Sequence, residues 1–254
     1  SSSGHLSIAQ NLLKIDAVVP EFFDVLLHLG TLISICIVYW QDIVDMFYEV
    51  LAFANLGPRA GERQERYPAA RLFFMIVLAT LPLFLILPIN DMLEGLYYNN
   101  VFIGLALILT GAMLYVSDKM KPGRKNENSM TVWDALIIGL CQCVATIPGL
   151  SRSGTTITAG IATGLRRDFA VKFSFLMSLP AVLGANILSL ADAVREGIDM
   201  QYMPAYLIGT AVAMVSGIGA ISLLKYISKN SKFGGFAYYC WVAGALTIVL
   251  SMIF

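Results

Sequence analysis

Charged residues are scarce in this sequence. Asp, Glu, Lys and Arg make up 13% of its 254 residues and hydrophobic residues 57%, whereas soluble domains carry about 25% charged residues. The deficit argues against a soluble globular protein and predicts an all-α membrane protein. The formal net charge is zero, so the sequence offers no basic surface for nucleic acid and no charge bias toward an acidic partner.

Metal-binding and nucleotide-binding patterns are missing as well. The sequence has no pair of carboxylates spaced for acid–base catalysis, no cluster of Cys and His, and no Walker-type loop. Each cysteine lies inside an apolar stretch without a neighbouring ligand, so we interpret all four as packing residues: Cys36, Cys141, Cys143 and Cys240. Any chemistry must therefore come from other residue types.

Six apolar windows approach the roughly 20 residues that a helix needs to cross a bilayer. They predict crossings at about 24–40, 70–88, 101–117, 173–190, 205–224 and 236–254. Two further apolar pieces, 131–147 and 154–165, meet at Pro148-Gly149, and the second is too short and too polar to cross alone. Such a pair predicts a re-entrant hairpin, which is tolerated at membrane depth only where protein or a wet cavity surrounds it.

The basic residues predict the orientation in the membrane. Fourteen Lys and Arg residues fall on one side of the six crossings and two, Lys14 and Arg195, on the other, with Arg152 at the hairpin tip left out. By the positive-inside rule the richer side is cytoplasmic. We therefore expect the loops 89–100 and 191–204, and the C-terminus, to face outward.

A weak internal repeat divides the chain. Shifting the sequence by 150 residues gives eight identities within forty positions, and three of them form the same Ser-x-Ser-Gly word at 1–4 and 151–154. Each half then consists of a polar hairpin followed by three crossings, so the second half enters the membrane upside down. We expect a single integral membrane domain with repeat 1 at about 1–117 and repeat 2 at about 131–254, whose two hairpin tips meet near the midplane.

Arg152 stands out at the second tip. An arginine at membrane depth costs roughly 2.5 to 3.5 kcal/mol or more unless it is paired or hydrated, which makes it a functional candidate; the alternative is an arginine that caps a helix or bonds loop carbonyls. The residues around it lie at a helix start, where backbone N–H groups and the helix dipole favour an anion. With the guanidinium they predict a phosphate cradle: Ser151, Ser153, Gly154 and Thr155.

The first tip supplies a histidine next to hydroxyl groups. His5 can take a proton from a serine or donate one to a leaving oxygen; the alternative is a hydrogen-bonded structural histidine. For His28, inside the first predicted crossing, we prefer packing or a helix–helix hydrogen bond. Together, a tip with hydroxyls and a base and a tip with an anion cradle indicate a phosphoryl-transfer site.

The segments "SSSGH" and "PGLSRSGTT", the latter preceded by "GLCQCVATI", resemble the undecaprenyl-pyrophosphate phosphatases of the BacA/UppP family along essentially the whole chain. The resemblance implies a hydrolase of the bacterial inner membrane that converts undecaprenyl pyrophosphate to undecaprenyl phosphate and inorganic phosphate. This reaction recycles the lipid carrier for peptidoglycan and other cell-wall synthesis, which also links such proteins to cell shape and bacitracin resistance. The expected partners are the polyprenyl pyrophosphate lipid and membrane lipids, not nucleic acid, and a homodimer is left open.

The resemblance also assigns roles. Ser2 would be the nucleophile or a phosphate contact, with His5 as its acid–base partner, and Arg152 would bind and neutralise the pyrophosphate. The remaining polar residues of the two motifs would bind substrate: Ser1, Ser3, Gly4, Ser151, Ser153, Gly154 and Thr155.

A divalent cation, Mg or Ca, is expected from the same resemblance. Family members carry a stretch of the form Glu-x-x-x-Glu-Phe-x-Pro directly before the two serines, and those glutamates are linked to activity and cation dependence. This sequence opens on Ser1 without a Met or a signal sequence, so we expect the glutamate-containing re-entrant helix to be missing from it. The metal ligands therefore cannot be placed, and a chain without those glutamates should be inactive or severely impaired.

Two alternative functions use the same features. A transporter or flippase of polyprenyl phosphate lipids could employ the inverted repeat and the anion cradle without chemistry, but it would not need Ser2 together with His5. A channel is disfavoured because the sequence shows no ring of charges and no filter motif.

Overall fold

The computed structural model describes residues 2–13, 21–56, 67–86, 88, 95–196, 200–230 and 233–253. Within these ranges the only β pairing is an isolated bridge between Lys125 and Leu165. The all-α prediction is confirmed. The elements are α1 (Ser2–Leu13), α2 (Glu21–Val38), α3 (Trp40–Phe53), α4 (Pro68–Thr80), η1 (Leu81–Leu85), η3 (Gly95–Tyr98), α6 (Asn100–Lys119), α7 (Val132–Val144), α8 (Arg152–Ala162), α9 (Arg167–Glu196), η4 (Met200–Tyr202), α10 (Met203–Asn230) and α11 (Gly234–Ile253), where η denotes a 3-10 helix.

Five helical segments in the described ranges are long and apolar enough to cross a membrane: Pro68–Leu85, Asn100–Lys119, Arg167–Ala191, Met200–Lys229 and Gly234–Ile253. A sixth crossing is possible if α2 and α3, which bend by 75° where they meet, count as one span. The chain is therefore an all-α polytopic membrane protein. The predicted crossing at 24–40 falls mainly on α2, the first helix of this bent pair. The bend occurs at Tyr39, which leaves helical geometry (φ −110°, ψ 22°). Neither Gly nor Pro lies at this position, so the sequence does not mark the bend.

The helices form two compact units, and both predicted tips lie in the same one. The first unit comprises Ser1–Val18, Leu78–Ser174 and Ile227–Phe254 and contains α1, α6, α7, α8 and α11. The second comprises Val19–Val77 and Phe175–Tyr226. In the second unit, helices pack closely where Gly30 of α2 meets α10: an added Cβ would lie 2.6 Å from the carbonyl oxygen of Thr210.

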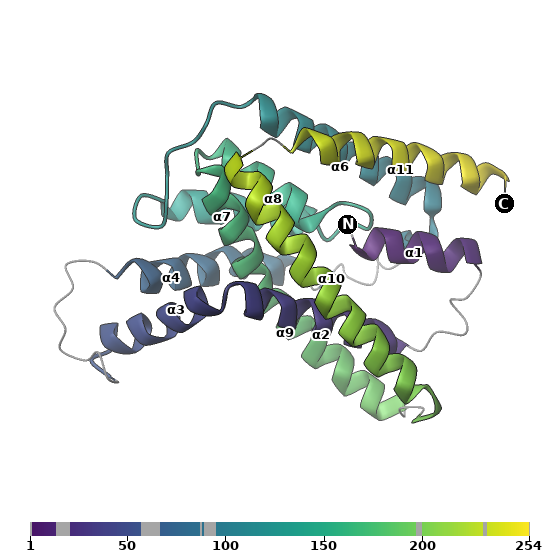
Figure 1. Cartoon of the computed structure of the whole chain (residues 1–254), viewed down its shortest axis with the longest axis horizontal. Coiled ribbons are helices and arrows are strands. Elements are labelled where there is room, and N and C mark those ends of the chain that lie inside the picture. Colours follow the sequence, from purple (N-terminus) through teal and green to yellow (C-terminus); the bar gives the residue numbers. More distant parts are fainter. Residues whose placement is uncertain are drawn as a thin grey trace. The chain divides into compact units, whose positions relative to one another are not determined.

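The first unit is built around the close contact of α6 and α11, which lie side by side (Figure 1). A Cβ on Gly104 would lie 2.8 Å from the carbonyl oxygen of Gly244, and a Cβ on Gly111 would lie 2.6 Å from the ring of Trp241. Because contacts further along α6 fall earlier along α11, the two helices run antiparallel. Small residues at such contacts let helix backbones approach in a membrane, where packing drives association.

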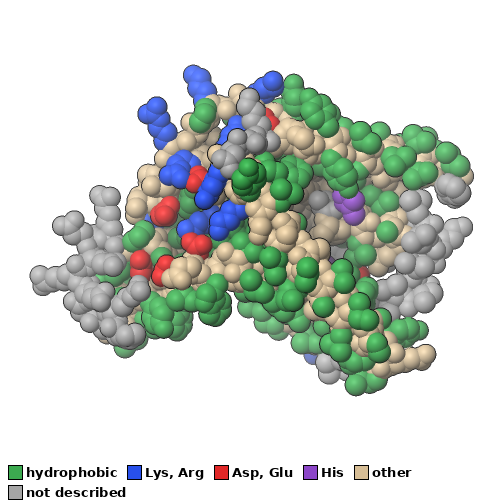
Figure 2. All heavy atoms as spheres, in the orientation of Figure 1, with side chains coloured by type: hydrophobic (Ala, Val, Ile, Leu, Met, Phe, Trp, Pro, Cys, Tyr) green, Lys and Arg blue, Asp and Glu red, His purple; other side chains and the backbone are tan. Residues whose placement is uncertain are grey.

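Large apolar side chains cover the outer surface of these helices. On α11 the buried residues are small, such as Ala237 and Gly244, while Val242, Leu246 and Val249 are each more than half exposed. In Figure 2 hydrophobic side chains cover the helices, and Lys and Arg side chains gather around α7 and the loop before it. This distribution suits a protein that exposes its helices to lipid and its loops to water.

Candidate active site

The tip of the α7–α8 hairpin is a tight turn that only glycine fits. Leu150 N–H donates to the carbonyl oxygen of Ile147 (3.2 Å), with Pro148 and Gly149 as the two central residues. Gly149 has φ 86°, so proline followed by a left-handed glycine forms a turn of the type II kind. A Cβ on Gly149 would also lie 2.8 Å from the carbonyl oxygen of Ile103 in α6. The turn ends α7 and aims the start of α8.

Ser151 caps α8 and ties it to α6. Its hydroxyl accepts from Gly154 N–H (3.1 Å), and its own N–H donates to Thr110 Oγ1 of α6 (3.1 Å). Two of the amides that were expected to bind an anion, those of Ser151 and Gly154, therefore donate to other groups of the protein. In the described part of the chain, the backbone N–H groups of Arg152 and Ser153 are the open donors of this first turn, and they point along the positive end of the helix dipole.

The hydroxyl groups of α8 differ in their surroundings. Ser153 Oγ lies 3.5 Å from Ser151 Oγ, which places two hydroxyls beside the open amides. Thr156 is bonded to Ser174 of α9 (2.6 Å) and is structural. The Thr155 hydroxyl is buried and has no hydrogen-bond partner among the described residues, a cost that a polar ligand would relieve.

Arg152 is exposed and has no carboxylate within salt-bridge distance in the residues the structure covers. Arg166 and Arg167, at the other end of α8, pair with Asp168 and Asp118 instead. Ser151 caps the helix, and Arg152 makes no side-chain hydrogen bond to a loop carbonyl within the described ranges, so the interpretation of Arg152 as a capping residue has no support. An unpaired guanidinium among apolar helices is well suited to an anion.

Arg152 interacts electrostatically with Tyr97 of η3. The same 3-10 helix is held by α1: Asn11 Nδ2 donates to the Tyr97 carbonyl oxygen (3.1 Å) and to Asn100 Oδ1 (2.8 Å). Both Arg152 of α8 and Asn11 of α1 therefore interact with η3.

The first tip is the start of α1. Ser2 and His5 are three residues apart on this helix, so they share one face. Ser2 is exposed, His5 and Ser3 are half-buried and Gly4 is buried, while Ser1 lies outside the described residues. His5 Nε2 lies 2.7 Å from the hydroxyl of Tyr239 on α11.

Both tips lie at the same height along α6. The start of α8 contacts Thr110, about halfway along the 20-residue α6. Tyr239, the partner of His5, comes two residues before Trp241, whose ring contacts Gly111. Thr110 and Gly111 are neighbours in α6, so the start of α8 and the part of α11 that contacts His5 both lie near the middle of α6. No hydrogen bond joins α1 to α8 directly in the described ranges.

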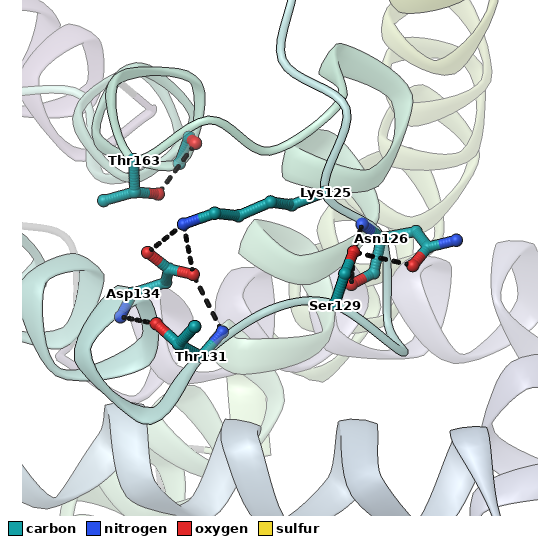
Figure 3. Close-up of polar contacts among 7 residues, drawn as sticks. Lys125, Asn126, Ser129, Thr131, Asp134 and Thr163 are labelled. Atoms are coloured by element: carbon teal, nitrogen blue, oxygen red, sulfur yellow. Dashed lines mark hydrogen bonds and ion pairs between the residues drawn. The ribbon is translucent and has the colours of Figure 1, made fainter. Parts of the chain in front are cut away.

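The base of the hairpin is closed by Lys125, as Figure 3 shows. Its ammonium group lies 2.8 and 2.9 Å from the two carboxylate oxygens of Asp134, and the buried Asp134 forms a capping box with Thr131 at the start of α7. The backbone of Lys125 bonds to Gly164 and Arg166, just after α8. One residue thus joins the beginning of α7 to the end of α8, which fixes the hairpin from the charged side.

A metal site is not found among these residues. The described part of the chain contains no group of three or more His, Cys, Asp and Glu residues that could hold a metal ion, and the two tips present hydroxyls, amides, one imidazole and one guanidinium. The divalent cation stays a prediction from the family resemblance.

His28 behaves as a structural residue. Its Nδ1 lies 2.7 Å from the carbonyl oxygen of Asp24, one turn earlier on α2. The bond is within its own helix rather than between helices. The cysteines are free thiols in buried or half-buried positions, as expected of packing residues.

Sequence reasoning missed several residues that shape the site. Thr131-x-x-Asp134 could have been read as a capping box from the sequence alone. Three others had no local signal, because each acts on a segment far away in the chain: Asn11, Thr110 and Tyr239.

The fold and the two tips define a polytopic membrane protein with two polar helix starts in one compact unit. The chain matches the family model described as "Bacitracin resistance protein BacA" over residues 1–246, and it belongs to this family. It is 34% identical over 258 residues to the undecaprenyl-diphosphatase of Methanosphaera stadtmanae and 36% identical over 255 residues to that of Halothermothrix orenii, each match covering 100% of this chain and 92% of the relative. "Undecaprenyl-diphosphatase 4" of Bacillus thuringiensis is 34% identical over 251 residues, which are 98% of this chain and 90% of the relative.

Proposed function

We propose that the protein is an undecaprenyl-diphosphate phosphatase, which hydrolyses the anhydride of the C55 lipid pyrophosphate to the monophosphate and inorganic phosphate. The observation that carries the proposal is Arg152 at a helix start, without a carboxylate partner among the described residues and in the same compact unit as Ser2 and His5. Relatives that match the chain from end to end bear the name undecaprenyl-diphosphatase. A cation beside open amides meets the need of phosphoryl transfer, in which charge on the phosphoryl oxygens must be neutralised.

The roles follow from the chemistry of each group. Arg152, with the amides of Arg152 and Ser153, takes up charge on the terminal phosphoryl group. Ser2 either attacks the terminal phosphorus or holds the water that does, and His5 accepts the proton of the attacking hydroxyl. The bond from phosphorus to the bridging oxygen breaks and the lipid monophosphate leaves. If Ser2 attacked, water then hydrolyses the phosphoserine; if water attacked, inorganic phosphate forms directly.

The same proposal includes the arrangement in the membrane. We place the protein in the inner membrane, with the basic connections and the ion pair of Lys125 and Asp134 in the cytoplasm. The C-terminus and the opening of the site are then on the periplasmic side. Residues 1–117 and 131–254 are taken as inverted repeats. Support comes from the antiparallel α6 and α11, the last helix of each half, and from the first compact unit, which draws on both halves.

The experiment that tests this function uses the purified full-length protein, including the glutamate-containing stretch that family members carry before the first motif, in detergent micelles, where transport across a membrane cannot occur. We expect inorganic phosphate and undecaprenyl phosphate to appear in equal amounts from undecaprenyl pyrophosphate. The lipid monophosphate, which lacks the anhydride bond, is the control substrate and should release none. Binding of the pyrophosphate without any release of phosphate would overturn the phosphatase and favour a lipid carrier.

A further inference from the structure

Tyr239 makes two different contacts with His5, although 234 residues separate them in the sequence. Its hydroxyl lies 2.7 Å from His5 Nε2. The two rings are also stacked, with centroids 5.7 Å apart and an interplanar angle of 7°. A stack fixes the plane of the imidazole and a hydrogen bond fixes its rotation within that plane, so the two contacts together leave the ring one orientation.

The contact is not explained by the packing of Tyr239 itself. The side chain of Tyr239 is 54% exposed, so close packing against α6 does not by itself set the position of its hydroxyl. The contacts between α11 and α6 are made by other residues, Ala237, Trp241 and Gly244. Tyr238, equally exposed, packs edge-on against Trp241 and has no contact with His5 among the interactions of the described residues.

A phenol is suited to a histidine that changes its protonation state. To take up a proton, the neutral imidazole must keep Nδ1 free of hydrogen, so its own hydrogen is on Nε2, and Nε2–H donates to the phenol oxygen both before and after Nδ1 is protonated. The bond therefore persists through a cycle in which His5 takes up and returns a proton. In serine and cysteine hydrolases the base is likewise oriented by a third group.

We propose that Tyr239 is a positioning residue for the reaction: its hydroxyl holds the imidazole of His5 in the orientation and tautomer that proton transfer requires. The inference rests on the proposed phosphatase function and on His5 as its acid–base group. It adds a residue from the last helix of the chain to a site whose motifs lie at 1–5 and 148–155.

The test compares Tyr239→Phe with Tyr238→Phe in the full-length protein, measuring kcat and KM for phosphate release from undecaprenyl pyrophosphate. Tyr239→Phe keeps the stacked ring and loses only the hydroxyl, so we expect kcat to fall by roughly ten- to hundredfold through misorientation of the base, with KM unchanged. Tyr238→Phe should match the wild type. Combined with His5→Gln, Tyr239→Phe should cause no further loss, because it acts only through His5.

A second measurement does not depend on activity. His5 and His28 are the only two histidines, so the ring nitrogens of labelled protein can be assigned by NMR with a His28→Gln variant. Tyr239→Phe should shift the Nε2 resonance of His5 and leave that of His28 unchanged. Unchanged His5 resonances, wild-type kcat in Tyr239→Phe, or losses that multiply in the double variant would each overturn the inference.

The outcomes separate this inference from the function on which it rests. If His5→Gln loses activity while Tyr239→Phe behaves as the wild type, the phosphatase stands and the role of Tyr239 is wrong. If His5→Gln keeps wild-type activity, the assignment of His5 fails and the role of Tyr239 fails with it.

Discussion

Arg152→Ala should lower kcat/KM for undecaprenyl pyrophosphate by about 10²- to 10³-fold, the loss typical of removing one preorganised donor to transition-state charge. Arg152 has no carboxylate partner in the described structure, and the open amides beside it come from the same helix start. The segment 148–155 contains no other Lys or Arg. Phosphate release from radiolabelled substrate measures the effect.

Two variants control for charge and for folding. Arg152→Lys keeps the charge but loses the planar fork that binds two oxygens, so it should recover only part of the activity. Arg166→Ala removes an exposed arginine that pairs with Asp168 at the far end of α8, and it should remain near the wild-type rate. An Arg152→Ala protein that retains activity within about threefold of the wild type would remove the guanidinium from the mechanism, because that ratio is worth less than about 0.7 kcal/mol.

Ser2→Ala should lower kcat by about a hundredfold or more, equivalent to at least about 2.7 kcal/mol of barrier. Ser2 is exposed at the start of α1 and lies on the same face as His5, so its hydroxyl has a base one turn away. Ser7→Ala, on a different face of α1, is the matched control and should leave kcat unchanged. Wild-type kcat in Ser2→Ala would exclude both roles proposed for this hydroxyl.

A chemical quench distinguishes the two roles of Ser2. Substrate labelled at the terminal phosphate should leave phosphate on Ser2 if the hydroxyl attacks phosphorus directly, and mass spectrometry identifies the modified residue. If Ser2→Ala is slow and the wild type carries no trapped phosphate, the hydroxyl holds the attacking water instead.

The features that were readable from the sequence are local ones. Pro148-Gly149 predicted the break between α7 and α8, because proline followed by a left-handed glycine favours one kind of turn. The apolar runs located the long helices to within a few residues. In each case the physical cause lies within a few residues of its effect.

The features that escaped prediction depend on tertiary contacts. The 75° bend between α2 and α3 falls at Tyr39, where the sequence carries no helix breaker. The use of Ser151 N–H by Thr110, and of His5 by Tyr239, joins segments 41 and 234 residues apart. The helix start around Arg152 was predicted to bind an anion through its amides, yet Ser151 N–H donates to Thr110 of α6 and Gly154 N–H to the Ser151 hydroxyl.

The joint action of the two tips is tested most directly by phosphate release from the Ser2→Ala/Arg152→Ala double variant beside each single variant. If both residues act on one phosphoryl group in one transition state, the double variant should be no more than about threefold slower than the slower single variant, because residues that work as a unit are not additive. Losses that multiply, as they do for independent positions, would contradict a single site built from both tips.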